Sequence, residues 1–215
     1  MARASLRDPR RRGVPLTFIK PCYWIVDSLS AESTMLDFGL GFDADFSQAM
    51  IAKYGLHSVG FDPTRKHQPA LKALEKSTGG KFRLVAAAIG GASGEVEFFE
   101  SMENVSGSLL STHRNVKHDT IRKYPVAVIT IAEAFERAGC AQPDLVKMDI
   151  EGPEYEALDA ASDETLRAAK QWVIEFHHES IEGIPYARTL RQIERFQRLG
   201  FKTYTRDNVN FLFFA

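Results

Sequence analysis

A glycine-containing turn and a later aspartate are the residues of this sequence best suited to bind a nucleoside-containing ligand. The turn includes Asp37, Gly39 and Gly41, and Asp62 follows about 20 residues further on. Glycines permit a tight turn and let a ligand approach the backbone closely. A carboxylate at the end of the next strand can accept hydrogen bonds from both hydroxyls of a ribose. We therefore predict a cofactor site at these residues.

Two cofactors fit the spacing of this turn. Gly39, Gly41 and Ala44 satisfy the dinucleotide pattern G-x-G-x-x-G/A, which places an anionic pyrophosphate at a helix N-terminus. The carboxylates of Asp37 and Asp43 would repel that group, although Asp43 could equally cap the helix. S-adenosylmethionine carries an ammonium and a sulfonium and no phosphate, so Asp37 can meet its amino-acid end. We favour S-adenosylmethionine and keep an NAD(P)-dependent oxidoreductase and a non-catalytic binding module as alternatives.

A second group of ionisable residues follows two later apolar segments. Asp149 and Glu151 end one segment, and Glu175 and His177 end the other, two positions apart and therefore on one face of a strand. In one hypothesis His177 or Asp149 is a general base that removes a proton from an acceptor hydroxyl. In another, Asp149, Glu175 and His177 bind a divalent cation that activates this hydroxyl. In the third hypothesis the role is structural, and Glu151 and Glu154 stabilise a helix N-terminus.

The elements that must position these residues alternate between strand and helix. This alternation predicts an α/β fold with a doubly wound, mostly parallel sheet. An apolar strand that contains Lys147 is unusual, and we expect this lysine to pair with a carboxylate. The predicted strands are 34–38, 57–61, 82–88, 144–150 and 171–177, the predicted helices are 43–54, 66–76 and 186–199, and an antiparallel hairpin of 201–205 and 210–214 closes the sheet.

The middle of the chain has a different pattern. Short strands are predicted at 94–100 and 107–111, and the loop 104–108 between them is expected to lie over the site. The segment 124–129 contains Pro125, which favours an edge strand. The small side chain of Ala88, at the end of the third strand, leaves room for an adenine ring. Thr130 and Glu133 have the spacing of a capping box and predict a helix that Gly139 ends.

Composition and charge exclude several classes of protein. The formal net charge is -1, which gives no overall field for nucleic acid or an anionic membrane. No uncharged apolar run approaches the roughly 18 residues of a membrane span. Cys22 and Cys140 lie far apart and outside any metal-binding motif, which favours reduced thiols in the cytoplasm. The arginines within residues 3–12 are interpreted as a solvated leader rather than a contact arm for an anionic partner.

Four segments of the sequence share a pattern with a known family: LDFGLG (36–41), VGFDP (59–63), VAAAIGGASGEVEFF (85–99) and DLVKMDIEGPEYEAL (144–158). Together they resemble the FkbM-type family of class I S-adenosylmethionine-dependent methyltransferases. The segment 144–158 is the most specific of the four, because in it a lysine, an aspartate and a Glu-Gly pair precede an acidic helix start. The family usually has glycine where Asp43 stands, and asparagine is common at the position of Gly41.

This resemblance implies a Rossmann-like fold and methyl transfer to a hydroxyl oxygen of a sugar, polyketide or other small metabolite. The expected partner is thus a small-molecule or glycan acceptor, and a homodimer is one way to complete its pocket. Residues 1–30 are predicted to form a basic leader and a preceding helix, and residues 31–215 a single methyltransferase domain. The predicted catalytic residues are Asp149, His177 and Glu175, and the predicted cofactor contacts are Asp37, Gly39, Gly41, Asp62 and Ala88.

Overall fold

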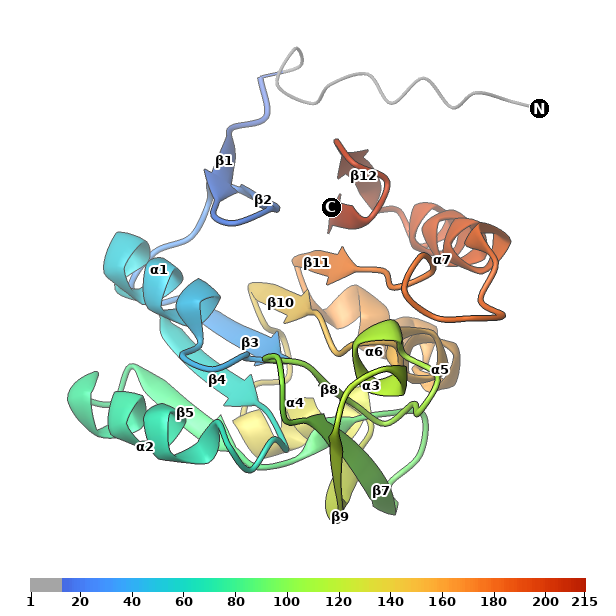
Figure 1. Cartoon of the computed structure of the whole chain (residues 1–215). Coiled ribbons are helices and arrows are strands. Elements are labelled where there is room, and N and C mark those ends of the chain that lie inside the picture. Colours follow the sequence, from blue (N-terminus) through green and yellow to red (C-terminus); the bar gives the residue numbers. More distant parts are fainter. Residues whose placement is uncertain (1–12) are drawn as a thin grey trace.

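A seven-stranded sheet forms the centre of the computed structural model, which describes residues 13–215 (Figure 1). The strand order is β12-β13-β11-β10-β3-β4-β5. Strands β11, β10, β3, β4 and β5 are parallel, whereas β13 is antiparallel to both β11 and β12. The predicted closing hairpin is therefore confirmed. The strands are β3 (Thr34–Phe38), β4 (His57–Phe61), β5 (Phe82–Val85), β10 (Leu145–Met148), β11 (Gln171–Glu175), β12 (Lys202–Thr205) and β13 (Asn210–Phe214).

Helices cover both faces of this sheet. On one face, buried side chains from α4, α5, α6 and α7 pack against Phe38, Met148 and Trp172. On the other face, α1 packs through Phe46 and Met50. Because successive strand residues point to opposite faces, each buried strand supplies apolar side chains to both cores. The helices are α1 (Asp45–Tyr54), α2 (Gln68–Ser77), α3 (Arg114–Lys117), α4 (Ile131–Ala138), α5 (Glu154–Ala160), α6 (Asp163–Ala168) and α7 (Tyr186–Arg198).

An antiparallel hairpin of β1 (Leu16–Ile19) and β2 (Tyr23–Val26) precedes the sheet. The prediction of a helix before residue 31 is therefore wrong for residues 13–30, where aromatic and β-branched side chains favour strands. The hairpin joins the α1 side of the core, and the backbone of Val26 exchanges hydrogen bonds with the side chain of Gln171. The arginine-rich segment 1–12 lies outside the described residues.

A second, four-stranded sheet lies beside the first, in the order β6-β9-β7-β8 (Figure 1). The strand predicted over 82–88 is divided, since β5 ends at Val85 and Ala88 begins β6 in this other sheet. The expectation that 124–129 is an edge strand is also wrong, because β9 lies between β6 and β7. Pro125 is tolerated because β6 pairs only with Val128 and Ile129. The strands are β6 (Ala88–Ile89), β7 (Gly94–Ser101), β8 (Gly107–Ser108) and β9 (Ile121–Ile129).

Helix α4 has the predicted capping box. The Thr130 hydroxyl accepts a hydrogen bond from the Glu133 amide at 3.3 Å, and the Glu133 carboxylate accepts one from the Thr130 amide at 2.8 Å. Gly139 ends the helix with φ of 68°. Helix α1 differs from its prediction, because it starts at Asp45 and is capped by Ala44 in a left-handed conformation, so Asp43 is not its cap.

We expect Thr130→Ala to lower the free energy of unfolding by about 1 kcal/mol, since it removes one half of the capping box. Urea unfolding followed by circular dichroism measures this change. Lys72→Ala, on the exposed face of α2, is the control and should stay within roughly 0.5 kcal/mol of the wild type. Equal stability of Thr130→Ala and the wild type would contradict a stabilising role for the box.

Candidate active site

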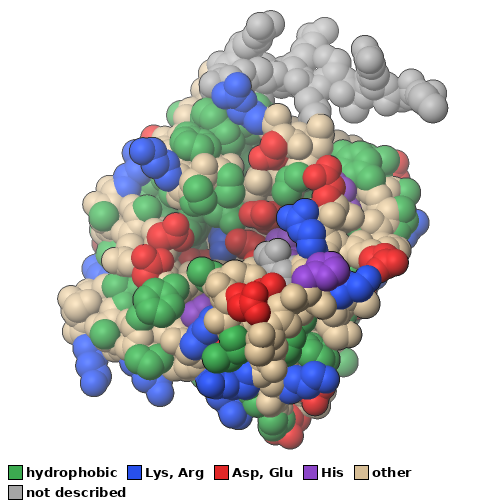
Figure 2. Space-filling model, in the orientation of Figure 1, with side chains coloured by type: hydrophobic (Ala, Val, Ile, Leu, Met, Phe, Trp, Pro, Cys, Tyr) green, Lys and Arg blue, Asp and Glu red, His purple; other side chains and the backbone are tan. Residues whose placement is uncertain are grey.

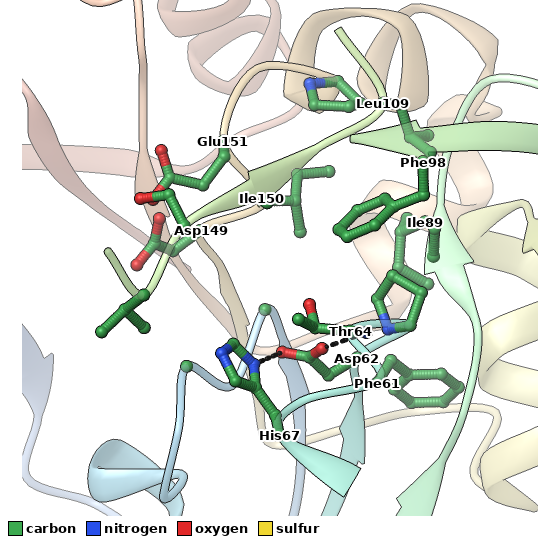
Figure 3. Close-up of a pocket in the computed structure, with 18 residues that line it drawn as sticks. Phe61, Asp62, Thr64, His67, Ile89, Phe98, Leu109, Asp149, Ile150 and Glu151 are labelled. Carbon is green, nitrogen blue, oxygen red and sulfur yellow. Dashed lines mark hydrogen bonds and ion pairs between the residues drawn. The ribbon is translucent and has the colours of Figure 1, made fainter. Parts of the chain in front are cut away.

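A cavity of about 180 Å³ opens at the carboxyl ends of β3, β4 and β10, between the two sheets. This is the edge at which open α/β sheets bind ligands. One wall carries the carboxylates of Asp149 and Glu151, and the opposite wall is apolar (Figure 3). Figure 2 shows acidic side chains gathered in a hollow near the centre of one face. The apolar wall consists of Phe61, Ala88, Ile89, Phe98 and Leu109.

The predicted glycine turn forms the floor of this cavity. Gly39 and Gly41 both line it and have φ of 82° and 64°. A Cβ atom on Gly39 would lie 1.7 Å from the backbone oxygen of Asp149, so no side chain fits there. The Gly39 amide donates to the Phe61 carbonyl at 3.0 Å, and its carbonyl accepts from the Lys147 ammonium. The turn is thereby attached to both neighbouring strands.

Asp62 lines the cavity directly after β4, as predicted. Its carboxylate accepts hydrogen bonds from the amides of Leu40 at 3.1 Å and Thr64 at 2.7 Å, which fix its orientation. Nδ1 of His67 lies 3.5 Å from the same carboxylate (Figure 3). The Nε2 atom of His67 is buried in the cavity wall and has no hydrogen-bond partner among the described residues. This part of the cavity can therefore accept further polar groups.

Asp37 lies behind the turn and does not line the cavity. Its side chain is buried, accepts a hydrogen bond from the Ser47 hydroxyl at 2.6 Å and lies 3.4 Å from the Lys147 ammonium. Of the predicted cofactor contacts, Gly39, Gly41, Asp62 and Ala88 reach the cavity. Asp37 therefore does not contact the cavity itself and supports it through its ion pair with Lys147.

Lys147 is the buried cation between the turn and the acidic wall. Its ammonium lies 3.4 Å from Asp37 and 3.5 Å from Asp149, which confirms the expected pairing with carboxylates. Burial alone lowers the pKa of Lys147, but the two carboxylates outweigh that effect and raise it above its ordinary value. The lysine is therefore charged and compensates part of the buried negative charge.

The three predicted catalytic residues meet at the acidic wall. His177 Nε2 lies 3.5 Å from Asp149 and 3.9 Å from Glu175. The Tyr23 hydroxyl donates to Asp149 at 2.8 Å and to Glu175 at 3.1 Å, and His177 Nδ1 is hydrogen-bonded to buried Glu154. Of the three predicted residues, Asp149 is the one that lines the cavity.

Burial and charge shift the protonation of this cluster. Burial and the charge of Asp149 raise the pKa of Glu175 to about 7. Burial lowers the pKa of His177, but the charge and hydrogen bond of Glu154 outweigh it and raise that pKa to about 10. Burial raises the pKa of Asp149, but Lys147 and His177 outweigh it, and the pKa is lowered. The carboxylates thus strongly stabilise a positive charge at His177.

Sequence reasoning missed two residues that hold this cluster. Tyr23 comes from the hairpin, more than a hundred positions before Asp149, and nothing in its local sequence indicates the contact. Glu154 is fully buried against His177, whereas its place at the start of α5 suggested a role in the helix dipole. The loop 104–108 does lie over the site, because Val105, Ser106 and Gly107 line the cavity.

A family comparison identifies the protein class. The sequence model described as "Methyltransferase FkbM domain" matches residues 39–203. The chain belongs to the FkbM methyltransferase family. No curated protein matches this chain significantly. Within residues 13–215, no helix of this FkbM-family protein has the length and apolar character needed to cross a membrane.

The mostly parallel sheet closed by an antiparallel hairpin confirms the predicted fold class, and the first of the following solved structures shares this fold. The fibrillarin pre-rRNA processing protein of Methanococcus jannaschii has a TM-score of 0.52 at 11% identity, covering 93% of this chain and 70% of that one. The precorrin-6y C5,15-methyltransferase of Geobacter metallireducens has a TM-score of 0.46 at 12% identity, covering 87% and 82%. The N-terminal domain of human METTL16 has a TM-score of 0.48 at 9% identity, covering 87% and 62%.

We expect Lys147→Met to lower the free energy of unfolding by about 3–5 kcal/mol, because it leaves Asp37 and Asp149 buried without a counter-charge. Urea unfolding measures the loss. Lys170→Met is the matched control, since its ammonium forms an exposed ion pair with Asp144 and its removal should cost less than about 1 kcal/mol. A Lys147 variant as stable as the Lys170 variant would show that the buried pairs contribute little.

Proposed function

We propose that this protein transfers a methyl group from S-adenosylmethionine to a hydroxyl oxygen of a small acceptor, such as a sugar, a polyketide or another metabolite. The observation that supports this most strongly is the charge of the cavity. Asp62, Asp149 and Glu151 line it, and no lysine or arginine does among the described residues. A carboxylate-lined cavity suits a cofactor that carries an ammonium and a sulfonium, and it fits membership of a methyltransferase family.

The same charge disfavours the dinucleotide alternative. A pyrophosphate requires cationic side chains or free amide groups at a helix N-terminus. Here the first turn of α1 carries Asp45, and Asp43 stands just before it. Carboxylates at both positions repel an anionic ligand. An NAD(P)-dependent oxidoreductase is therefore the weaker proposal.

The residues present fit the parts of S-adenosylmethionine. We assign the ribose hydroxyls to Asp62, whose orientation two backbone amides fix. We assign the adenine ring to the apolar wall that includes Ala88 and Phe98, and the amino-acid end to the backbone of Gly39 and Gly41. When bound, this cofactor supplies a methyl group already activated by a positively charged sulfur.

The acceptor side is assigned to the acidic wall. Asp149 is the predicted catalytic residue that faces the cavity, with a side chain that is 25% exposed. We assign it to accept the hydroxyl proton, whose acidity rises as the new carbon–oxygen bond forms. Tyr23 and Lys147 keep its carboxylate in place. Glu175 and His177 lie behind Asp149 and orient it through Tyr23 and through direct contact.

The decisive binding experiment is isothermal calorimetry with S-adenosylhomocysteine, with NADH as the comparison ligand. We expect micromolar binding of the first and none of the second. Asp62→Asn should weaken binding by about 1–3 kcal/mol, the scale of a hydrogen bond to a charged group. Asp43→Asn is the control and should bind as the wild type does, because Asp43 is exposed and outside the cavity. Binding of NADH alone would overturn the proposal.

Transfer itself is tested by incubating the protein with methyl-labelled S-adenosylmethionine and a panel of sugars, phenols and macrolide alcohols. We expect label on oxygen, located by mass spectrometry and NMR. With the acceptor so found, Asp149→Asn should lower kcat by ~10²–10⁴-fold, the usual contribution of a proton acceptor, and leave affinity for S-adenosylhomocysteine unchanged. Label on nitrogen, or full activity of Asp149→Asn, would contradict these assignments.

A further inference from the structure

We propose that His113, Glu151 and His177 form a binding site for one divalent transition-metal ion, next to the methyl-transfer cavity. One ligand atom of each residue lies within 4.8 Å of those of the other two. The three residues come from separate segments: His113 precedes α3, Glu151 follows β10 and His177 follows β11. This site goes beyond the proposed function, since neither the family nor the cofactor assignment requires it.

His113 is the first observation that points to an ion. Its side chain is 1% exposed, and neither ring nitrogen makes a hydrogen bond among the described residues. Buried polar groups without hydrogen bonds are costly and rare in folded proteins. The Nε2 atom lies 2.8 Å from a carboxylate oxygen of Glu151 without the geometry of a hydrogen bond. An ion between the two residues would satisfy both.

His177 can bind the same ion, which would replace the proton on Nε2 and be stabilised by the same carboxylates. Its Nδ1 atom is hydrogen-bonded to the buried carboxylate of Glu154, and metal-binding histidines usually have such a partner on the ring nitrogen that does not bind the metal. Its Nε2 atom lies 3.5 Å from the oxygen of Glu151 that also faces His113. Ligands about 2.1 Å from one metal are separated by roughly 3.0–3.4 Å, so these positions need only small adjustments.

Glu151 is held in an uncommon conformation that aims it at both histidines. Its φ is 60°, a left-handed value that costs a residue with a Cβ atom free energy. The Ser108 hydroxyl donates to its carbonyl oxygen at 2.6 Å, and the Ser106 hydroxyl donates to its other carboxylate oxygen at 3.0 Å. Two hydroxyls therefore stabilise this strained residue and leave one oxygen facing the histidines.

The alternative set of Asp149, Glu175 and His177 is less suited to an ion. Both carboxylates already accept hydrogen bonds from Tyr23. The Lys147 ammonium lies 3.5 Å from Asp149 and repels a second cation there. The set with His113 has no lysine or arginine in contact with it among the described residues.

The ligand types determine which ions the site prefers. Two imidazoles and one carboxylate suit Mn²⁺, Fe²⁺, Co²⁺ or Zn²⁺, whereas Mg²⁺ and Ca²⁺ prefer oxygen ligands. Three protein ligands leave open positions on the ion, and Glu151 lies in the cavity wall (Figure 3). An acceptor oxygen in the cavity can therefore reach the ion, which would hold it beside Asp149 and lower the pKa of its hydroxyl.

The test uses the full chain without an affinity tag, after removal of metals with a chelator. Co²⁺ is added and its visible absorption recorded, and Zn²⁺ and Mg²⁺ are titrated by calorimetry. We expect one Co²⁺ or Zn²⁺ per chain and much weaker binding of Mg²⁺. His113→Ala should weaken Zn²⁺ binding by about 10-fold or more. His118→Ala, an exposed histidine in the same segment, is the matched control and should bind like the wild type.

Thermal unfolding of each variant confirms that it is folded, and Glu151→Gln is the second variant should His113→Ala unfold. Absence of one tight Zn²⁺ site, equal binding of Mg²⁺, or unchanged binding in both variants overturns the metal site. Binding of S-adenosylhomocysteine is measured on the same metal-free samples. Loss of zinc binding with retained S-adenosylhomocysteine binding supports the metal site, whereas zinc binding without S-adenosylhomocysteine binding contradicts only the proposed function.

Discussion

The buried ammonium of Lys147 is the interaction on which the rest of the site depends. It contacts Asp37, Asp149 and the carbonyl oxygen of Gly39, so one side chain joins the glycine turn to the acidic wall. Lysine is rarely buried without partners of opposite charge. Because these contacts come from β3, the turn after it and β10, the pairing of the two central strands fixes the distance between the two halves of the cavity.

Much of this arrangement could be predicted from the sequence, because local patterns determine it. The apolar strands, the Thr130 capping box and the glycine turn all depend on residues near one another in the chain. The parallel order then brings Asp62 and Asp149 to one edge of the sheet. The resemblance to the FkbM family, which residues 39–203 confirm, supplied the reaction class that the pattern alone left open.

The remaining features depend on contacts between distant segments. Asp37 lies outside the cavity because its carboxylate contacts Ser47 and Lys147, and no local sequence pattern indicates either contact. Likewise, the edge position predicted from Pro125 is wrong for β9, because β6 pairs with the far end of that strand, although only β7 pairs with it at Pro125. The residues of one strand do not indicate how far along that strand a neighbouring strand pairs with it.

The hairpin that carries Tyr23 lies outside the region matched by the family, yet it completes the interior. It covers the α1 side of the central sheet and donates the hydroxyl that bridges Asp149 and Glu175. A boundary drawn at residue 39, where the family match begins, would remove all of β3 together with this hairpin. For this chain, the unit recognised by family membership and the unit that folds are therefore different in extent, and a shortened recombinant protein should retain the hairpin.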